Sequence, residues 1–433
     1  MNLFFDMTRL SIRMFRSAPT GIDRVEYAYA KELLDVSETT GVFTTPLFAG
    51  ALTKTRALDL LQRVERAWRL GRGQAEDVVF QQVKDWLEAP LDPEAKRANR
   101  FRSQRAISVM REARFFPARD LARASARLNR WIDRSAPKPA VYFHCSHAQL
   151  DRMRRFEWLV RKKLPSVFFV HDAIPIEYPE FCSPGAYGRH VRRLMTVSKF
   201  ASLAIVNSEE SRRAVKRALI DRGARAPDIE VVPLGVDDAF LAASAQRPIK
   251  AQSPYFLYVG TIEPRKNILF LLSVWRRLVE RLGACAPRLV LAGRRGWENE
   301  NIVDILERSH ALAPLIVEAS DLTDSGLATL MAGAVALVAP SVAEGFGLPV
   351  AECLAAGTPA LVSDIAAHRE VGGDMVLYAD PVDGPSWISA IQTLMDPRAQ
   401  LSAEMRAKIA GYQPMTWKAH VEDAMRIIER VQR

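Results

Sequence analysis

The amino-acid sequence predicts an α/β protein with two doubly wound parallel-sheet domains, and three observations support this fold class. The chain has 433 residues, more than the roughly 250–300 that a single hydrophobic core accommodates. Short apolar runs alternate with helical patterns in both halves, which is typical of parallel sheets covered by helices on each face. Residues 242–254 contain two prolines and are rich in Ala, Ser and Gln. They predict a linker between a domain at 1–241 and a domain at 254–416.

The first domain begins with a strand and a helix. Residues 3–7 form an apolar run, and after a loop to Gly21 the apolar positions Val25, Tyr29 and Leu33 repeat every four residues. Further strand-like runs occupy residues 140–145, 167–170, 203–206 and 231–232. This alternation predicts a parallel sheet.

Residues 51–138 interrupt the first domain. They are rich in Arg, Leu and Ala, contain no convincing strand, and predict a helical insertion in that domain. The segment holds 20 Lys/Arg and 11 Asp/Glu, a difference of +9 within a chain of net charge +10. Such a basic surface suits a phosphate-rich partner, either nucleic acid or an anionic membrane, or is a solvated helical face.

The second domain shows the alternation more clearly. Apolar runs at residues 255–259, 288–291, 315–317, 335–338 and 360–362 are separated by helical patterns. Residues 417–433 are predicted to form an amphipathic terminal helix. The pattern leaves open whether this helix closes the second domain or crosses back to the first.

Composition restricts the class of protein. Hydrophobic residues make up 48% and charged residues 25% of the chain, and no window has the roughly 18 unbroken apolar residues of a membrane span. The N-terminus lacks the cationic start of a secretory signal. The four cysteines form no Cys-x-x-Cys pair, which argues against zinc and redox sites and favours a cytoplasmic protein.

Two turns that follow strands of the second domain carry paired cations. Ligands of open parallel sheets bind beyond the carboxyl ends of the strands. Residues 260–267 (GTIEPRKN) place Arg265 and Lys266 at a helix start after Gly260, and residues 293–297 (GRRGW) place Arg294 after the next strand. Both turns are candidate diphosphate sites, or ordinary loops with exposed charges.

A third turn lies between two carboxylates. Gly345 and Gly347 free the backbone N–H groups to face an anion at a helix start, with Glu344 before the turn and Glu352 inside the helix. These carboxylates suit the hydroxyl groups of a sugar. Alternatively, they complement the helix dipole.

The third turn, EGFGLPVAE, resembles the E-x7-E motif of retaining glycosyltransferases of family 4. Agreement extends through the second half in the expected order, over residues 260–267, 291–297, 324–333, 358–364 and 368–370. The resemblance implies the GT-B fold, in which two Rossmann-like domains face each other across a cleft.

The family pattern implies roles for residues of the second half. Glu352 would hold the ribose and Glu344 the transferred sugar. Lys266 would bind phosphate, with Arg265 beside it. The remaining donor-binding residues that the pattern implies are Gly260, Thr261, Arg294, Gly345, Phe346, Gly347 and Leu348. Many members carry Arg where this chain has Thr261, so the second phosphate cation is either Arg265 or Arg294.

The first half matches the family at fewer positions. The VHDAIP segment at residues 170–175 resembles bacterial mannosyltransferase-like members and implies that His171 lines the cleft, although a lone histidine at a strand end is commonly structural. Gly21 matches a glycine turn near the diphosphate. Asp23 and Arg24 are candidate acceptor contacts, or a helix cap with solvated charges.

The implied reaction is sugar transfer with retention of anomeric configuration, without a metal or cofactor, because cations replace the metal. The expected donor is a nucleotide-diphosphate sugar, with GDP-mannose or a relative favoured. The acceptor would be a glycan or polyprenyl-linked glycan of cell-envelope polysaccharide synthesis. The alternatives are a GT-B epimerase or phosphorylase-like enzyme, or a nucleic-acid-binding protein, for which the tryptophans of the insertion are too scattered.

The same basic insertion predicts a peripheral location on the inner face of the cytoplasmic membrane. Its cations would attract anionic lipid and its apolar side chains would insert shallowly. The candidate side chains are Trp68, Leu70, Phe101, Phe115 and Phe116.

Overall fold

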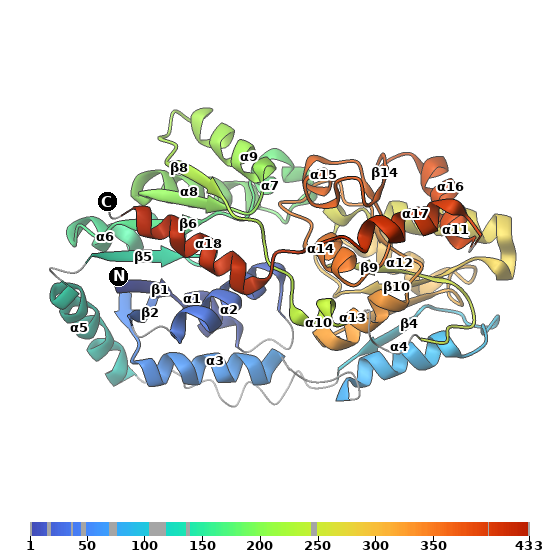
Figure 1. Ribbon diagram of the computed structural model, residues 1–433, viewed down its shortest axis with the longest axis horizontal. Coiled ribbons are helices and arrows are strands. Elements are labelled where there is room, and N and C mark those ends of the chain that lie inside the picture. Colours follow the sequence, from blue (N-terminus) through green and yellow to red (C-terminus); the bar gives the residue numbers. More distant parts are fainter. Residues whose placement is uncertain are drawn as a thin grey trace.

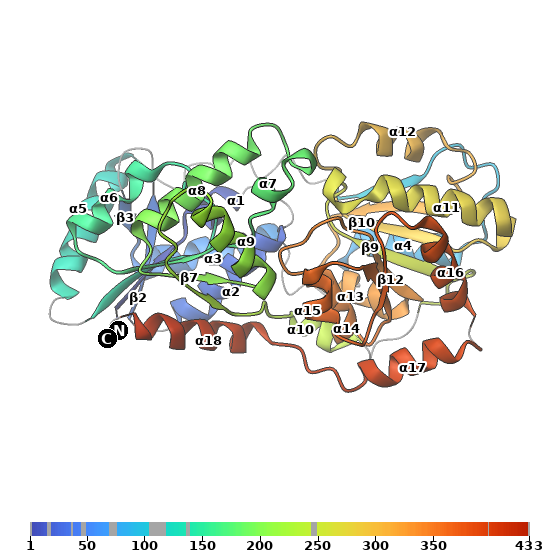
Figure 2. The same ribbon diagram turned by 90° about the horizontal axis from the view of Figure 1, so that it is seen from above.

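The computed structural model describes residues 2–14, 19–35, 38–44, 49–68, 76–103, 118–135, 139–243, 249–396 and 398–431. It contains two seven-stranded sheets, each with helices on both faces (Figures 1 and 2). The two doubly wound parallel-sheet domains predicted from the sequence are therefore confirmed. None of the described helices is long and apolar enough to cross a membrane.

The first sheet has the strand order β3-β2-β1-β5-β6-β7-β8 and is parallel except for β3. The buried rings of Phe5, Phe143 and Phe169 project from neighbouring strands and contact Tyr29 of α2. The strands are β1 (Asn2–Asp6), β2 (Thr39–Thr44), β3 (Ala49–Ala51), β5 (Ala140–His144), β6 (Ser166–Phe169), β7 (Leu203–Val206) and β8 (Asp228–Val231).

The helices of this half include both long covering helices and single turns. They are α1 (Thr8–Arg13), α2 (Gly21–Leu34), α3 (Lys54–Trp68), α5 (Ala118–Ser135), η3 (Met153–Phe156), α6 (Glu157–Arg161), α7 (Ile174–Glu177), η4 (Pro179–Phe181), α8 (Ala186–Phe200) and α9 (Glu209–Ile220). The short α10 (Asp238–Leu241) follows and packs on α13 of the second half.

The second sheet is parallel, with the order β14-β13-β12-β9-β10-β11-β4. Its central strands are almost wholly buried, as expected for a sheet covered on both faces. The strands are β4 (Asn99–Arg102), β9 (Tyr255–Val259), β10 (Arg288–Ala292), β11 (Ile316–Ser320), β12 (Ala336–Ala339), β13 (Ala360–Ser363) and β14 (Leu377–Ala379). The helices are α4 (Val78–Glu88), η6 (Pro264–Lys266), α11 (Ile268–Leu282), η7 (Gly283–Cys285), α12 (Glu300–Arg308), α13 (Asp324–Gly333), α14 (Leu348–Ala355), α15 (Ala366–Gly372), α16 (Gly384–Met395) and α17 (Gln400–Ile409).

The prediction of a strandless helical insertion confined to the first domain is wrong. α3 and α5 pack on the first half, but α4 and β4 join the second (Figure 1). β4 pairs in parallel with β11 as an edge strand. Arg288 lies 4.8 Å from the ring centroid of Trp86 and donates to the Ala89 carbonyl at 2.7 Å, which fixes α4 on the second sheet. β4 escaped prediction because its pattern, NRFR, is mostly exposed and polar.

The terminal helix α18 (Trp417–Arg430) crosses back to the first half, the alternative that the sequence left open (Figure 2). It packs beside α2, where the His420 ring lies edge-on to Tyr29. The Pro233 carbonyl lies 2.7 Å from His420 Nδ1. Thr416 forms an isolated parallel β-bridge with Val236, and this bridge anchors the crossing.

Candidate active site

The candidate site lies where the N-terminus of α14 meets the first half. Gly347 begins this eight-residue helix with φ of 96°, a conformation that favours glycine. Pro349 fits the first turn because its missing N–H would have no partner there. The sequence pattern around Glu344 therefore folds as predicted, as a glycine turn that opens a helix.

Glu344 gathers two cations at this turn. Arg265 Nη1 lies 2.8 Å from one carboxylate oxygen, and Lys266 Nζ contacts the other. The Ser341 hydroxyl donates to the same group at 2.7 Å. Burial alone would raise the pKa of Glu344, but Arg265 and Lys266 hold it well below its usual range. Glu344 is therefore ionised, and it positions both cations beside the helix N-terminus.

The two basic turns pack directly against each other. A side chain at Gly293 would collide with the Gly260 carbonyl, and the Ile262 N–H donates to the Arg294 carbonyl at 2.8 Å. The Arg294 guanidinium, however, points to Asp321, with Nε 3.0 Å from the carboxylate. Of the two cations that the sequence left open, the geometry favours Arg265, which accompanies Lys266 on Glu344.

The first half contacts the α14 turn through Gly345. The Gly345 carbonyl accepts hydrogen bonds from the hydroxyls of Ser208 at 2.5 Å and Ser211 at 3.1 Å. A Cβ at Gly345 would lie 2.6 Å from the backbone carbonyl of His171. This glycine therefore allows the two halves to meet at van der Waals distance.

His171 is buried beside that contact. Its Nε2 lies 2.8 Å from the Cys145 carbonyl, and because a carbonyl only accepts, Nε2 carries the proton. Burial lowers the pKa of His171 to about 4, so the ring is neutral at pH 7. The geometry gives His171 a structural hydrogen bond beside the contact between the two halves, and its contact with the donor sugar stays a prediction.

Glu352 faces the first half through Arg24. Arg24 forms an ion pair with Asp324, and its other guanidinium nitrogen lies 3.8 Å from Glu352. Burial raises the pKa of Glu352 to about 8; Arg24 opposes this shift, whereas Asp324 and Asp237 add to it. Glu352 therefore lies in a buried group of carboxylates that Arg24 of α2 links.

Asp23 and Gly21, at the start of α2, differ in their surroundings. Asp23 is buried and accepts from the Thr20 backbone at 2.8 Å and from Arg9 Nε at 2.5 Å. Asp23 therefore acts as the helix cap that the sequence also allowed. Among the described residues, no atom lies within 4 Å of the Cβ position of Gly21, and its role near the diphosphate stays a prediction.

Sequence reasoning missed the partners that hold these groups. Asp324 lay inside a matched segment, but only the fold shows that it and Asp237 flank Glu352 and Arg24. Ser208 and Ser211 likewise gained a role only through their contact with the other half. Among the residues that the structure describes, no cluster of three or more His, Cys, Asp or Glu side chains is arranged to hold a metal ion.

Comparison with known proteins supports the interpretation of this half. Residues 253–397 match the family model described as "Glycosyl transferases group 1". The O-antigen chain mannosyltransferase B of Escherichia coli is 37% identical over 166 residues, 38% of this chain and 42% of that protein. The O-antigen chain mannosyltransferase RfbU of Salmonella typhimurium is 29% identical over 231 residues, 52% of this chain and 59% of that protein. The chain spans about half the length of these curated relatives.

Solved structures share the two-domain architecture over most or all of the chain. Anabaena HepE, in complex with UDP-glucose, matches over 99% of both chains with a TM-score of 0.61 at 14% identity. The trehalose-phosphate synthase of Burkholderia vietnamiensis covers 73% of this chain and 77% of its own, with a TM-score of 0.54 at 14% identity. These likenesses confirm the GT-B fold.

Proposed function

We propose that this chain, whose residues 253–397 match the group 1 glycosyl transferases, is a retaining glycosyltransferase that uses a nucleotide-diphosphate sugar. The observation that carries the proposal is the cluster of Lys266, Arg265 and Glu344 beside the N-terminus of α14, facing the first half. Two cations and a helix N-terminus suit a diphosphate.

The cluster is suited to the charge that develops during transfer. As the bond between the anomeric carbon and the diphosphate oxygen breaks, negative charge grows on the diphosphate and the sugar becomes oxocarbenium-like. Lys266 and Arg265 would stabilise that charge without reorganisation, since Glu344 already holds them in place. The acceptor oxygen would bond to the anomeric carbon from the side of departure, and its proton would pass to the diphosphate. No metal is needed for this step.

The relatives' names favour a mannosyl donor, so GDP-mannose is the first candidate. The acceptor would be a glycan or polyprenyl-linked glycan of cell-envelope polysaccharide synthesis. Thermal shift with GDP, UDP and dTDP sugars tests the donor, because a ligand at 100 times its dissociation constant stabilises the fold by about 2.7 kcal/mol. We expect stabilisation by GDP-mannose and transfer of its sugar. Absence of stabilisation by every sugar nucleotide would refute the proposal.

We also propose that the basic insertion brings the enzyme to the cytoplasmic face of an anionic membrane. The support is its +9 charge excess. Trp68 cannot insert into lipid, because it is buried against Tyr27, and Phe101 is partly buried; Leu70, Phe115 and Phe116 lie outside the described residues. Co-sedimentation should therefore need anionic vesicles and weaken with salt. Equal pelleting with neutral vesicles would contradict it.

A further inference from the structure

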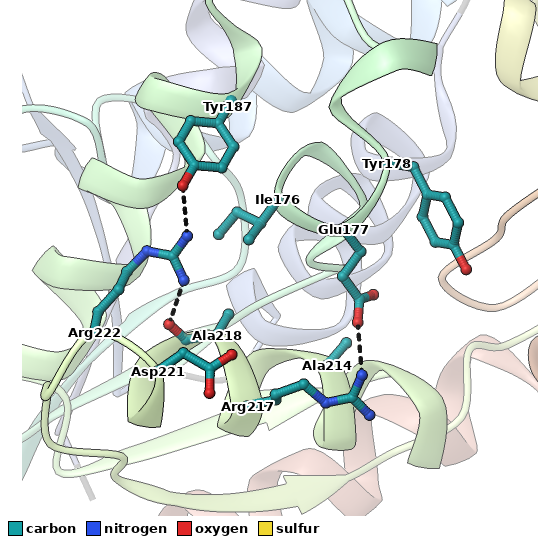
Figure 3. A pocket seen from close by; sticks show the side chains of 9 residues that line it. All are labelled: Ile176, Glu177, Tyr178, Tyr187, Ala214, Arg217, Ala218, Asp221 and Arg222. Carbon is teal, nitrogen blue, oxygen red and sulfur yellow. Dashed lines mark hydrogen bonds and ion pairs between the residues drawn. The ribbon is translucent and has the colours of Figure 1, made fainter.

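A surface groove of the first half stands apart from the site described above. It has a volume of about 650 Å³ and lies between α7, α8 and α9 (Figure 3). That volume falls within the roughly 300–1,000 Å³ of ligand sites. Tyr187 and Tyr178 stand on opposite sides of the view, with Ile176 and Glu177 between them.

The groove combines exposed aromatic rings with planar polar groups. The exposed fractions of Tyr187 and Tyr178 are 46% and 37%, so both side chains are open to a ligand. Arg222 fixes Tyr187, because its Nη2 donates to the phenol oxygen at 2.9 Å and its Nη1 donates to the Ala218 carbonyl at 2.7 Å. The phenol hydrogen of Tyr187 is still free to donate outward, since its oxygen serves as the acceptor.

The charges of the groove cancel. Arg217 lies 3.8 Å from Glu177, and Asp221 and Arg222, which follow α9, also line the groove. Within the described part of the chain, the Asp221 carboxylate has no protein partner and can accept hydrogen bonds. Two cations and two carboxylates sum to zero, so the charge of the lining does not favour a nucleotide, a lipid headgroup or nucleic acid over an uncharged ligand.

The groove offers exposed aromatic rings, both hydrogen-bond donors and acceptors, and no net charge. These properties fit a chain of neutral sugars. The apolar face of a pyranose packs on an aromatic ring, and its hydroxyls pair with guanidinium and carboxylate groups. We propose that this groove, defined by Tyr178, Tyr187, Arg217, Asp221 and Arg222, binds a neutral oligosaccharide. The inference rests on the proposed function, since the oligosaccharide would be the acceptor chain behind the sugar that reacts.

The groove is joined to the candidate active site by a short stretch of chain. α7 begins three residues after His171, and Tyr178 follows α7 directly. Cys182, at the end of the same stretch, is near Arg265: burial raises the pKa of its thiol to about 11, and the Arg265 charge opposes that shift. At the other side, the Glu209 N–H of α9 donates to Glu370 of α15 at 2.8 Å. A sugar chain in the groove would therefore lie along segments that reach the contact between the two halves.

The test is direct binding of neutral linear mannose and glucose oligosaccharides of one to five residues, measured by calorimetry on the full chain. We expect affinity to rise with length, and Tyr187→Ala and Arg222→Ala each to weaken binding of the pentasaccharide about tenfold. Tyr187→Phe, which keeps the ring, should stay within about threefold of wild type. Arg213→Ala is the matched control, because Arg213 is an exposed arginine of α9 that pairs with Glu210 outside the groove.

Kinetics supply a second readout. Tyr187→Ala should raise KM for a long acceptor and leave kcat, and KM for a single-sugar acceptor, unchanged. Binding that does not depend on oligosaccharide length, or equal affinities of wild type and Tyr187→Ala, would show that the groove is not the oligosaccharide site. Transfer from a sugar nucleotide would still support the proposed function in that case. Failure of any sugar nucleotide to bind or react, with oligosaccharide binding intact, would instead overturn the proposed function.

Discussion

At the residue scale, the site depends on buried charges whose partners lie far apart in the sequence. Glu344 is paired with cations 78 and 79 residues away, and Arg24 meets Asp324 from the other half. Removing one member of such a buried pair leaves an uncompensated charge, which costs far more than loss of a surface pair. Single substitutions at these positions should therefore have separable effects on binding, on chemistry and on stability.

Lys266→Ala and Glu352→Ala should damage different steps. Lys266 would act on charge that develops as the donor bond breaks, so its loss should lower kcat by roughly 10²–10³-fold. Glu352 would hold the ribose, so its loss should mainly weaken binding of the sugar nucleotide. Steady-state kinetics together with calorimetry separate the two effects. Turnover by Lys266→Ala at the wild-type rate would show that the assignment is wrong.

Stability should fall as pH rises from about 6.5 to 8, above the range in which buried histidines such as His171 and His420, whose pKa burial lowers to about 4, oppose this trend. Burial raises the pKa of both Glu26 and Glu352 to about 8, above that of the unfolded chain. Between these pH values the folded state holds protons that the unfolded state has released, so the free energy of unfolding decreases by about 1.4 kcal/mol per pH unit for each group.

Chemical denaturation across this pH range checks the prediction. Glu26→Gln and Glu352→Gln should each flatten the pH dependence, because glutamine does not titrate. Glu26 lies outside the proposed donor contacts, so only Glu352→Gln should also weaken binding of nucleotide. A profile that rises between pH 6.5 and 8, or that neither variant changes, would contradict the assigned protonation states.

At the scale of elements, the second half was well predicted and the insertion was not. The strands at residues 255–259, 288–292 and 360–363 lie within a residue of the predicted runs because they are continuous buried apolar segments. β4 and β14 are short and partly exposed, so their pattern resembles loop sequence. α4 has a helical pattern, but nothing local in the sequence shows which half it covers.

Asp77 joins the insertion to the second half through two helix starts. One carboxylate oxygen accepts from Phe80 N at 3.0 Å and caps α4, and the other accepts from Thr323 N at 2.6 Å, at the start of α13. Asp77→Ala removes a cap and leaves a buried N–H unpaired, so we expect a loss of about 2–4 kcal/mol of folding free energy. Chemical denaturation measures it.

The matched control for that substitution is Asp59→Ala. Asp59 pairs with Arg63 one helical turn away on α3, and its side chain is 43% exposed. Loss of such a surface pair should change stability by less than about 1 kcal/mol. Equal effects of the two substitutions would mean that α4 does not depend on its contact with α13.

At the scale of the whole molecule, the chain passes between the two halves four times. Judged from the described elements, it enters the second half before α4, returns before α5, enters again before α10, and returns before α18 (Figure 1). The sequence predicted the linker at 242–254 and allowed the return at 417, but the two crossings around α4 and β4 depend on tertiary pairing that no local pattern encodes. The candidate site therefore lies between two halves that are connected by several crossings of the chain.

The most direct test of the account follows the reaction of the whole chain by proton NMR, with GDP-mannose, a mannose oligosaccharide acceptor and excess EDTA. We predict a new glycosidic bond with the anomeric configuration of the donor, and one nucleoside diphosphate released per bond formed. Activity should persist in EDTA because Lys266 and Arg265 supply the positive charge. An inverted product, activity that returns only with added magnesium or manganese, or release of free sugar without a glycoside would contradict the account.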